Sequence, residues 1–113
     1  MQKETISCST FRKTIQEESN LLLVDVRDEE KFLQESLHIE GIETKNAPYV
    51  HMKEQDQPFD EKTSHTFRDA TIITVCTTGN KAQKAAALLR EKGYRALALE
   101  GGLTAWNDLK ENR

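Results

Sequence analysis

Three short, continuous runs of apolar residues constrain the fold of this chain more than any other feature. They cover residues 21–25, 72–76 and 96–99. A strand with one face in water alternates apolar and polar residues, whereas a continuous apolar strand is typical of a parallel sheet that is covered on both faces. We expect a weaker strand over residues 41–45 and an edge strand over residues 4–7.

Helical patterns lie between the apolar runs, and the strongest covers residues 82–92. Its apolar residues recur at the i, i+3, i+4 and i+7 spacing of a helix with one buried face, and Gly93 ends the pattern. The residues on this face are Ala82, Ala85, Ala86 and Leu89. Alternating strands and helices predict a single α/β domain over residues 1–113, with a parallel sheet covered by helices on both faces.

Three weaker helical patterns and one irregular segment complete the chain. The expected helices run from an N-cap at Ser9 or Thr10 to residue 18, from an N-cap at Asp28 over residues 29–37, and over residues 103–111. The polar segment 51–69 contains a proline and has no convincing period. We predict that this segment is a surface excursion with about one helical turn.

Charge and hydropathy exclude several classes of protein. The net charge of −3 argues against a nucleic-acid-binding protein, which needs a surplus of basic side chains. Apolar runs such as residues 21–24 are too short to span a bilayer, and no apolar signal region follows Met1. We therefore expect a soluble, cytoplasmic protein without membrane contact, and we expect a monomer because no sustained apolar stripe is exposed.

The second part of the chain differs in charge from the first. Residues 72–113 carry 7 basic and 4 acidic side chains, whereas residues 1–71 carry 9 basic and 15 acidic ones. A ligand of the second part is therefore expected to be anionic. The two cysteines, Cys8 and Cys76, lie far apart in unlike contexts, which favours two free thiols in a reducing compartment.

The candidate site is the cysteine loop, residues 76–81, which joins an apolar run to the strongest helical pattern. Ligands of a parallel sheet bind beyond the carboxyl ends of its strands, where Cys76 is expected. Gly79 and Asn80 tolerate a positive φ, so the loop can turn backbone N–H groups inward ahead of a helix. Such a nest, with Lys81 nearby, favours a thiolate, the nucleophilic form of cysteine.

A second interpretation of Cys76 stays open at this point. Cysteine is among the most buried residue types, and at the end of a core strand it is commonly a small hydrophobic residue without reactivity. The Gly-Asn-Lys turn that leads directly into a helix favours a reactive site over this interpretation.

From about residue 6 to residue 106 the chain resembles the single-domain rhodanese family. The motifs that carry the resemblance are Asp25-Val26-Arg27, Phe32, the LHIEG segment at 37–41, Asn46-Ala47-Pro48, the cysteine loop, Tyr94, Glu100-Gly101-Gly102 and Ala105-Trp106. The resemblance implies an α/β fold with a parallel sheet of about five strands. It also implies a cysteine that accepts a sulfur atom from a donor, holds it as a persulfide and passes it to a nucleophilic acceptor.

Loop length separates this chain from other families with a similar cysteine loop. Phosphatases whose cysteine loop is similar have a longer loop, with an arginine six places after the cysteine. In this chain Ala82 stands at that place. The residue directly before Cys76 is Val75 and not a histidine. A thioredoxin-like dithiol is excluded because Gly79 occupies the place of the second cysteine.

Two residues depart from the commonest rhodanese loop. Thr77 and Lys81 stand where many members have arginine. An arginine binds an oxyanion through two parallel N–H groups, whereas lysine offers a point charge. We therefore expect persulfide chemistry to be retained and thiosulfate to be a mediocre donor.

The resemblance assigns Cys76 as the nucleophile of a sulfurtransferase. Backbone N–H groups are expected to stabilise the thiolate and the persulfide, and their residues are Thr78, Gly79, Asn80, Lys81 and Ala82. The hydroxyls of Thr77 and Thr78 are expected to donate to oxygens of the donor, and Lys81 adds positive charge. The side chains of Thr77 and Asn80 are equally well interpreted as loop formers.

Other chemistry-bearing residues are assigned structural roles. Asp25 and Arg27 are expected to hold a loop, His38 to hydrogen-bond the backbone, Phe32 and Trp106 to lie in the core, and Gly101-Gly102 to form a tight turn. Cys8 either resolves the persulfide or is an ordinary half-buried thiol, and we favour the second. The histidines and cysteines lack metal-ligand spacing, so we expect neither a metal nor an organic cofactor.

Two alternatives to a thiosulfate-type sulfurtransferase remain open. One is a non-catalytic rhodanese-like module that binds a partner protein, although interaction-only members of the family commonly lack the cysteine. The other is a persulfide carrier whose donor is a protein. The expected partner is accordingly a small anionic sulfur donor or a protein persulfide donor.

Overall fold

Five parallel strands form one sheet in the order β1-β5-β4-β2-β3. The computed structural model describes residues 4–18, 20–55, 59 and 61–111. The strands are β1 (Thr5–Ile6), β2 (Leu21–Asp25), β3 (Glu43–Asn46), β4 (Thr71–Val75) and β5 (Arg95–Leu99). The predicted α/β fold with a parallel sheet of about five strands is confirmed, and the short β1 lies at an edge as expected.

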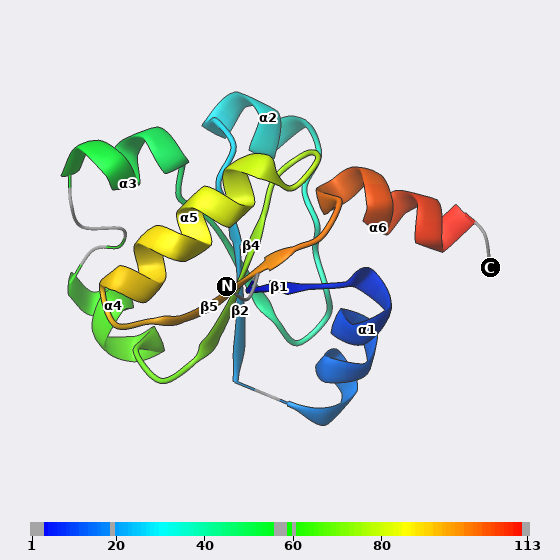
Figure 1. Ribbon diagram of the computed structural model, residues 1–113, viewed down its shortest axis with the longest axis horizontal. Helices are drawn as coiled ribbons and strands as arrows, with labels where there is room; N and C mark the ends of the chain where they lie inside the picture. Colours follow the sequence, from blue (N-terminus) through cyan, green and yellow to red (C-terminus); the bar gives the residue numbers. More distant parts are fainter. Residues whose placement is uncertain (1–3, 19, 56–58, 60, 112–113) are drawn as a thin grey trace.

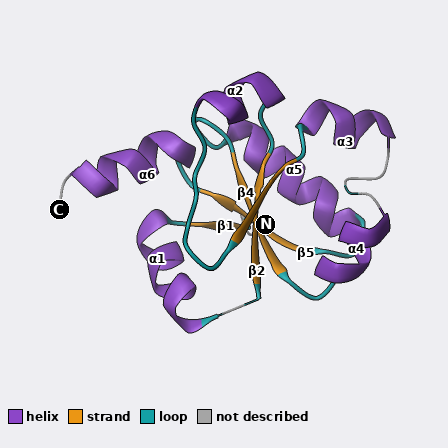
Figure 2. Ribbon diagram, turned by 180° about the vertical axis from the view of Figure 1, so that it is seen from behind, coloured by secondary structure: helices purple, strands orange, loops and turns teal. Residues whose placement is uncertain are grey.

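Helices cover both faces of this sheet (Figures 1 and 2). They are α1 (Cys8–Glu17), α2 (Glu29–Gln34), α3 (Tyr49–Gln55), α4 (Glu61–Phe67), α5 (Asn80–Glu91) and α6 (Gly102–Glu111). Helices α1 and α6 lie on one face, α3, α4 and α5 lie on the other, and α2 lies beyond one end of the strands. None of the described helices has both the length and the apolar composition that a membrane span requires.

The continuous apolar strands contribute side chains to two separate cores, one on each face of the sheet. In β2, Leu22 and Val24 belong to the core under α3 and α5, whereas Leu21 and Leu23 belong to the core under α1 and α6. Because successive side chains of a strand point to opposite faces, a strand that is buried on both faces must be apolar throughout. The central position of β2 and β4 in the sheet therefore explains their composition.

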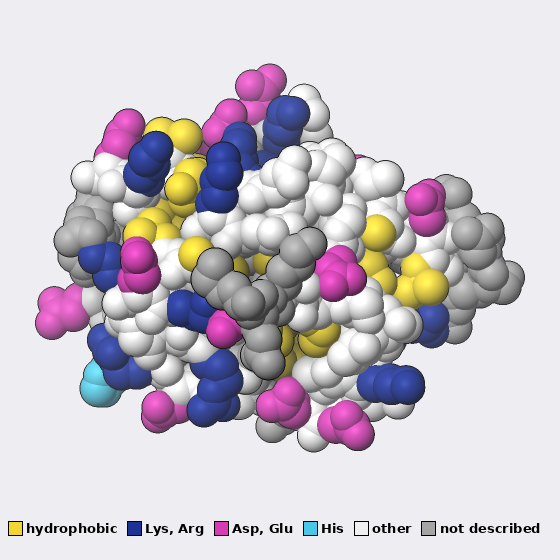
Figure 3. Space-filling view, in the orientation of Figure 1, with side chains coloured by type: hydrophobic (Ala, Val, Ile, Leu, Met, Phe, Trp, Pro, Cys, Tyr) yellow, Lys and Arg dark blue, Asp and Glu magenta, His cyan; other side chains and the backbone are white. Residues whose placement is uncertain are grey.

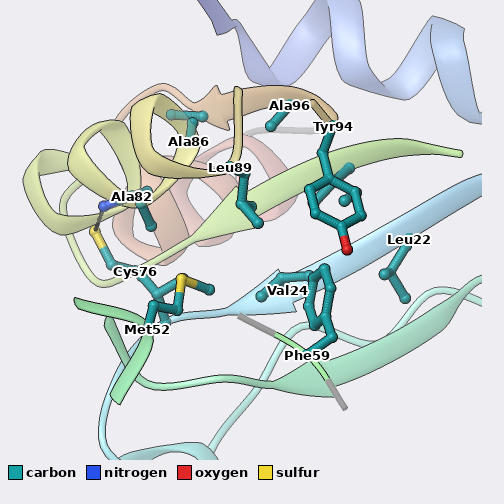
Figure 4. Close-up of a cluster of buried hydrophobic side chains, with 14 residues drawn as sticks. Leu22, Val24, Met52, Phe59, Cys76, Ala82, Ala86, Leu89, Tyr94 and Ala96 are labelled. Carbon is teal, nitrogen blue, oxygen red and sulfur yellow. Dashed lines mark hydrogen bonds between the residues drawn. The ribbon is translucent and has the colours of Figure 1, made fainter. Parts of the chain in front are cut away.

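The predicted buried face of α5 is confirmed. Its four residues Ala82, Ala85, Ala86 and Leu89 are all fully buried in the first of these cores (Figure 4). The helix begins at Asn80, two residues before the predicted start, because Gly79 serves as its N-cap. Small alanines on this face let α5 pack closely on β4 and β5.

The prediction for segment 51–69 was wrong. The segment holds most of α3 and all of α4, and it contributes to the core instead of only covering the surface. Met52 and Phe59 are buried, and the Phe59 ring meets the Tyr94 ring edge to face, with centroids 5.5 Å apart. Met52 in α3 and Phe59 just before α4 are isolated large apolar side chains, so no helical period was visible in the sequence. The proline of this segment lies outside the described residues.

Two helix boundaries also differ from the prediction. The N-cap of α1 is Ser7, not Ser9 or Thr10, because its hydroxyl oxygen accepts the Thr10 N–H at 3.1 Å. Asp28 occupies the N-cap position of α2 as predicted, but its side chain makes no capping hydrogen bond. The helix ends at Gln34 instead of residue 37, since the chain must turn there to bury Leu37 in the second core.

The two aromatic residues assigned to the core have different surroundings. Trp106 packs against the second core, and its ring lies 5.6 Å from that of Phe11. Phe32 lies in α2, which covers neither face of the sheet, and its half-buried ring contacts the ring of His38 instead. His38 forms a hydrogen bond with the Ser36 hydroxyl at 2.6 Å. Its partner is therefore a side chain and not the backbone group that was expected.

A buried ion pair holds the segment that follows β2. The carboxylate of Asp25 accepts hydrogen bonds from the Nε, Nη2 and backbone N–H groups of Arg27, and Nη2 also donates to the Glu35 carbonyl. Both side chains are almost fully buried. The pair therefore ties the end of β2 to the end of α2, which is the loop-holding role that the sequence suggested.

We predict that Asp25→Ala lowers the free energy of unfolding by about 3–5 kcal/mol, because it leaves a buried guanidinium without its counter-charge. Urea unfolding followed by circular dichroism measures this change. Glu43→Gln is the matched control, since Glu43 forms an exposed pair with Lys45 on β3 and is expected to cost less than about 1 kcal/mol. Equal losses in the two variants would contradict a structural role for the buried pair.

Candidate active site

Cys76 is the first residue after β4, at the carboxyl end of the parallel sheet. Its neighbour β2 ends at the same level, because Asp25 is paired with Val75 and the Val26 N–H donates to the Val75 carbonyl at 2.9 Å. The strand thus ends one residue earlier than predicted, and Cys76 belongs to the loop. The thiol is nearly buried, with 4% of the residue exposed.

Two backbone N–H groups donate to the sulfur of Cys76. Gly79 N–H lies 3.0 Å from Sγ, and Ala82 N–H, in the first turn of α5, lies 3.4 Å from it. Figure 4 shows Sγ directed at the amide of Ala82. The amino end of a helix carries partial positive charge, so the site offers hydrogen bonds and a favourable dipole to a negative charge at Sγ.

Of the five predicted N–H donors, only those of Gly79 and Ala82 bond to Sγ within the part of the chain that the structure describes. Gly79 meets Sγ because its φ of 109° lies in the left-handed region and turns the chain sharply into α5. The amides of Thr78, Asn80 and Lys81 belong to the same turn without contacting Sγ. Their assignment to the site therefore stays a prediction.

The turn between β5 and α6 packs directly on the cysteine loop. The N–H groups of Leu103 and Thr104 donate to the carbonyls of Cys76 and Thr77, at 2.9 and 3.1 Å. Gly102 is required at this approach, since a Cβ built on it would lie 2.2 Å from the Cys76 carbonyl oxygen. The predicted tight turn at Gly101-Gly102 is thus also the support on which the loop rests.

A cavity of about 330 Å³ opens above the sulfur. Its wall is formed by Arg27, Asp28, Lys31, Cys76, Thr77, Thr78, Asn80, Lys81 and Lys84. The sequence-predicted side chains Thr77, Thr78, Asn80 and Lys81 are therefore brought together around Cys76. Gly79 and Ala82 are buried behind the sulfur and reach it through their backbone.

Four residues of this wall were missed by the sequence analysis, namely Arg27, Asp28, Lys31 and Lys84. The first three follow the end of β2, which lies beside β4 in the sheet. Ligands bind beyond the carboxyl ends of parallel strands, which is why Cys76 was expected at the site. The same reasoning applies to the residues after β2, and it would have located them if β2 and β4 had been taken as neighbours. Lys84 lies three residues after Lys81, on the same side of α5.

The wall carries a surplus of positive charge. Lys31, Lys81 and Lys84 are exposed, and none of them forms an ion pair with a carboxylate among the described residues. Asp28 is the acidic residue of the wall. Arg27 stays charged, because its hydrogen bonds to Asp25 raise the pKa of the guanidinium above its ordinary value although burial opposes this. The cavity therefore attracts anions.

Cys8, the second cysteine, lies away from this cavity. Both cysteines are free, and they belong to the cores on opposite faces of the sheet. The thiol of Cys8 is buried rather than half-buried and lies 3.8 Å from the Glu100 carbonyl oxygen. Burial, and secondarily the charge of Glu100, raise the pKa of Cys8 above its ordinary value. The placement favours a structural thiol over one that resolves a persulfide.

The sheet, the cysteine loop at its carboxyl edge and the glycine turn beneath it together define a rhodanese-like domain. The sequence model of the family described as "Rhodanese-like domain" matches residues 7–109. The chain therefore belongs to the rhodanese-like domain family, and the resemblance found in the sequence is confirmed.

Named relatives are consistent with this membership. The Bacillus subtilis protein named "Putative sulfurtransferase YtwF" is 26% identical over 106 residues, which span 94% of this chain and 92% of that protein. "Adenylyltransferase and sulfurtransferase MOCS3-2" of Zea mays is 29% identical over 102 residues, which are 89% of this chain but 20% of the maize protein. These relatives support a sulfurtransferase role in general terms.

A solved structure has the same fold. The rhodanese-related protein from Thermoplasma volcanium superposes with a TM-score of 0.71 at 21% identity, over 94% of this chain and 92% of that one. Within the described residues, no three histidine, cysteine or acidic side chains gather into a set that could hold a metal ion.

We predict that Gly102→Ala lowers the free energy of unfolding by more than about 3 kcal/mol, because the new Cβ would overlap the Cys76 carbonyl. Gly41→Ala is the matched control, since Gly41 also has a positive φ but open space around its Cβ position. It is expected to cost about 1–2 kcal/mol from backbone strain alone. Urea unfolding compares the two, and similar losses would show that the contact with the loop is unimportant.

We predict that Cys8, in a Cys76→Ser variant, reacts with iodoacetamide more slowly at pH 8 than N-acetylcysteine does. A raised pKa means that the thiolate of Cys8 forms only at higher pH, so the midpoint of the rate-against-pH curve should lie above that of the free thiol. Mass spectrometry of the alkylated protein measures the rate. A midpoint at or below that of N-acetylcysteine would contradict the shift.

Proposed function

We propose that the protein is a sulfurtransferase that accepts a sulfane sulfur on Cys76 and passes it to a thiophilic acceptor. One observation carries the proposal: the Cys76 sulfur lies at the base of a cation-lined cavity and receives hydrogen bonds from the Gly79 and Ala82 amides. A thiol enclosed only by apolar side chains would have no such donors. The arrangement favours a nucleophilic thiolate.

In the first half-reaction the Cys76 thiolate attacks the outer sulfur of the donor. With thiosulfate, a bond forms between Sγ and the sulfane sulfur while the sulfur–sulfur bond of the donor breaks. The electron pair of that bond leaves with sulfite, so thiolate and thiosulfate become the Cys76 persulfide anion and sulfite. The outer sulfur then occupies the cavity, which Thr78, Asn80 and Lys81 line, and the amides of these residues are the donors proposed for it.

In the second half-reaction a nucleophile attacks the outer sulfur of the persulfide. With cyanide, a carbon–sulfur bond forms, the sulfur–sulfur bond breaks, and its electron pair returns to Sγ. Persulfide anion and cyanide thus become thiolate and thiocyanate, and the site is restored. The same amides that held the starting thiolate hold the leaving thiolate.

Thiosulfate is proposed to be a mediocre donor. Among the described residues, Arg27 is the one arginine in the cavity wall. Its Nε and Nη2 groups already donate hydrogen bonds to the Asp25 carboxylate and to the Glu35 carbonyl. The edge of the Arg27 guanidinium that would bind a sulfonate through two parallel N–H groups is therefore occupied. Lys81 offers only a point charge in its place.

We predict that reduced protein gains one sulfur atom on incubation with a sulfane sulfur donor, as measured by intact mass spectrometry. The gain should be removed by cyanide, retained in Cys8→Ser and absent in Cys76→Ser. It should be slower with thiosulfate than with the persulfide form of a cysteine desulfurase. A gain only from the desulfurase would favour a persulfide carrier, and no gain from either donor would refute the proposal and favour a binding module.

A further inference from the structure

Two cations of the cavity wall lie outside the cysteine loop. Lys31 comes from α2 and Lys84 from α5, and their helices approach the cavity from different parts of the chain. Neither lysine contacts the Cys76 sulfur, which has the Gly79 and Ala82 amides as its donors. The two side chains therefore add nothing to the stabilisation of the thiolate by hydrogen bonds, and their charges face the space above it.

The size of the cavity also exceeds what sulfur transfer alone requires. A volume of about 330 Å³ lies in the range of small-molecule sites, whereas an outer sulfur atom adds only one atom to Cys76. The lysines of the wall outnumber Asp28, so the remaining space favours a substrate that carries negative charge. Figure 3 shows Lys and Arg side chains gathered over α2 and the first turns of α5. The acidic residues Glu29 and Glu30 of α2 do not line the cavity.

We propose that Lys31 and Lys84 bind the carboxylates of a small acceptor thiol that carries two of them. This inference rests on the proposed function and names the substrate class of its second half-reaction. A lysine ammonium is a point charge that suits one carboxylate, so two lysines on separate helices match two separate carboxylates. A neutral thiol leaves both ammonium groups without a partner. Lys31 and Lys84 are thus specificity-determining residues for the acceptor.

The transfer step balances without a further reactant. The acceptor thiolate attacks the outer sulfur of the Cys76 persulfide anion, and a new sulfur–sulfur bond forms to the acceptor. The bond between Sγ and the outer sulfur breaks, and its electron pair stays on Sγ. Acceptor thiolate and Cys76 persulfide anion become acceptor persulfide anion and Cys76 thiolate.

The test measures the decay of preloaded Cys76 persulfide by rapid mixing and mass spectrometry. The acceptors are mercaptosuccinate with two carboxylates, mercaptoacetate with one and 2-mercaptoethanol with none, and each rate is divided by the thiolate concentration present. We expect the rates to fall in that order. The ratio of the mercaptosuccinate rate to the 2-mercaptoethanol rate should fall about fivefold in Lys31→Gln and again in Lys84→Gln.

Lys13→Gln is the matched control, because Lys13 is an exposed lysine of α1 on the other face of the sheet. It should leave the ratio unchanged. A variant that merely damages the fold slows all three thiols alike and also leaves the ratio unchanged, so the ratio isolates the recognition of carboxylates. Equal thiolate-corrected rates for the three acceptors in the wild type would overturn the inference while leaving sulfur transfer intact.

Binding to the unloaded protein provides a second measurement that needs no persulfide. Malate, which has a hydroxyl in place of the thiol of mercaptosuccinate, should shift the amide resonances of Lys31 and Lys84 in heteronuclear NMR spectra. The dissociation constant should rise about fivefold in each single lysine variant. If no persulfide forms but malate binds in this way, the proposed function fails and the site stands. Absence of lysine-dependent malate binding overturns the site.

Discussion

The architecture of the site depends on two hydrogen bonds between α6 and the cysteine loop. The first N–H groups of a helix have no partner within the helix, and here those of Leu103 and Thr104 are satisfied by the carbonyls of Cys76 and Thr77. Because the C=O and N–H of a trans peptide point in opposite directions, this contact turns the following N–H groups away from α6. Only glycine at position 102 permits the approach.

This arrangement divides the site into a backbone part and a side-chain part. The sulfur is held by amides of Gly79 and Ala82, whose donor groups persist in any side-chain variant that keeps the turn. The cavity wall above it is made of side chains from α2, the loop and α5. Substitutions in that wall can therefore alter which anion is bound while leaving the amides at the sulfur in place. The exposed lysines of the wall are the residues through which such changes act.

The sequence predicted those elements whose pattern reflects their own burial. The strand β2 and the apolar face of α5 were identified because burial on two faces or on one face imposes a characteristic spacing. The helices α3 and α4 escaped notice, since the large apolar side chains buried in this segment, Met52 in α3 and Phe59 before α4, are isolated and show no period. Phe32 was misplaced for a related reason: its apolar character is visible in the sequence, but the position of α2 beyond the end of the sheet is not.

By itself the sequence determined the fold class and the position of Cys76 at a strand end, because these follow from local composition and from spacing along the chain. The family followed from the resemblance of its motifs. Tertiary structure alone decided which charges from other parts of the chain line the cavity above the sulfur. Arg27 and Lys31 lie more than forty residues before Cys76, and the parallel pairing of β2 with β4 brings them to the same edge of the sheet. The pairing of strands is a long-range choice that local propensities do not encode, so the full wall of the cavity could only be seen in the folded chain.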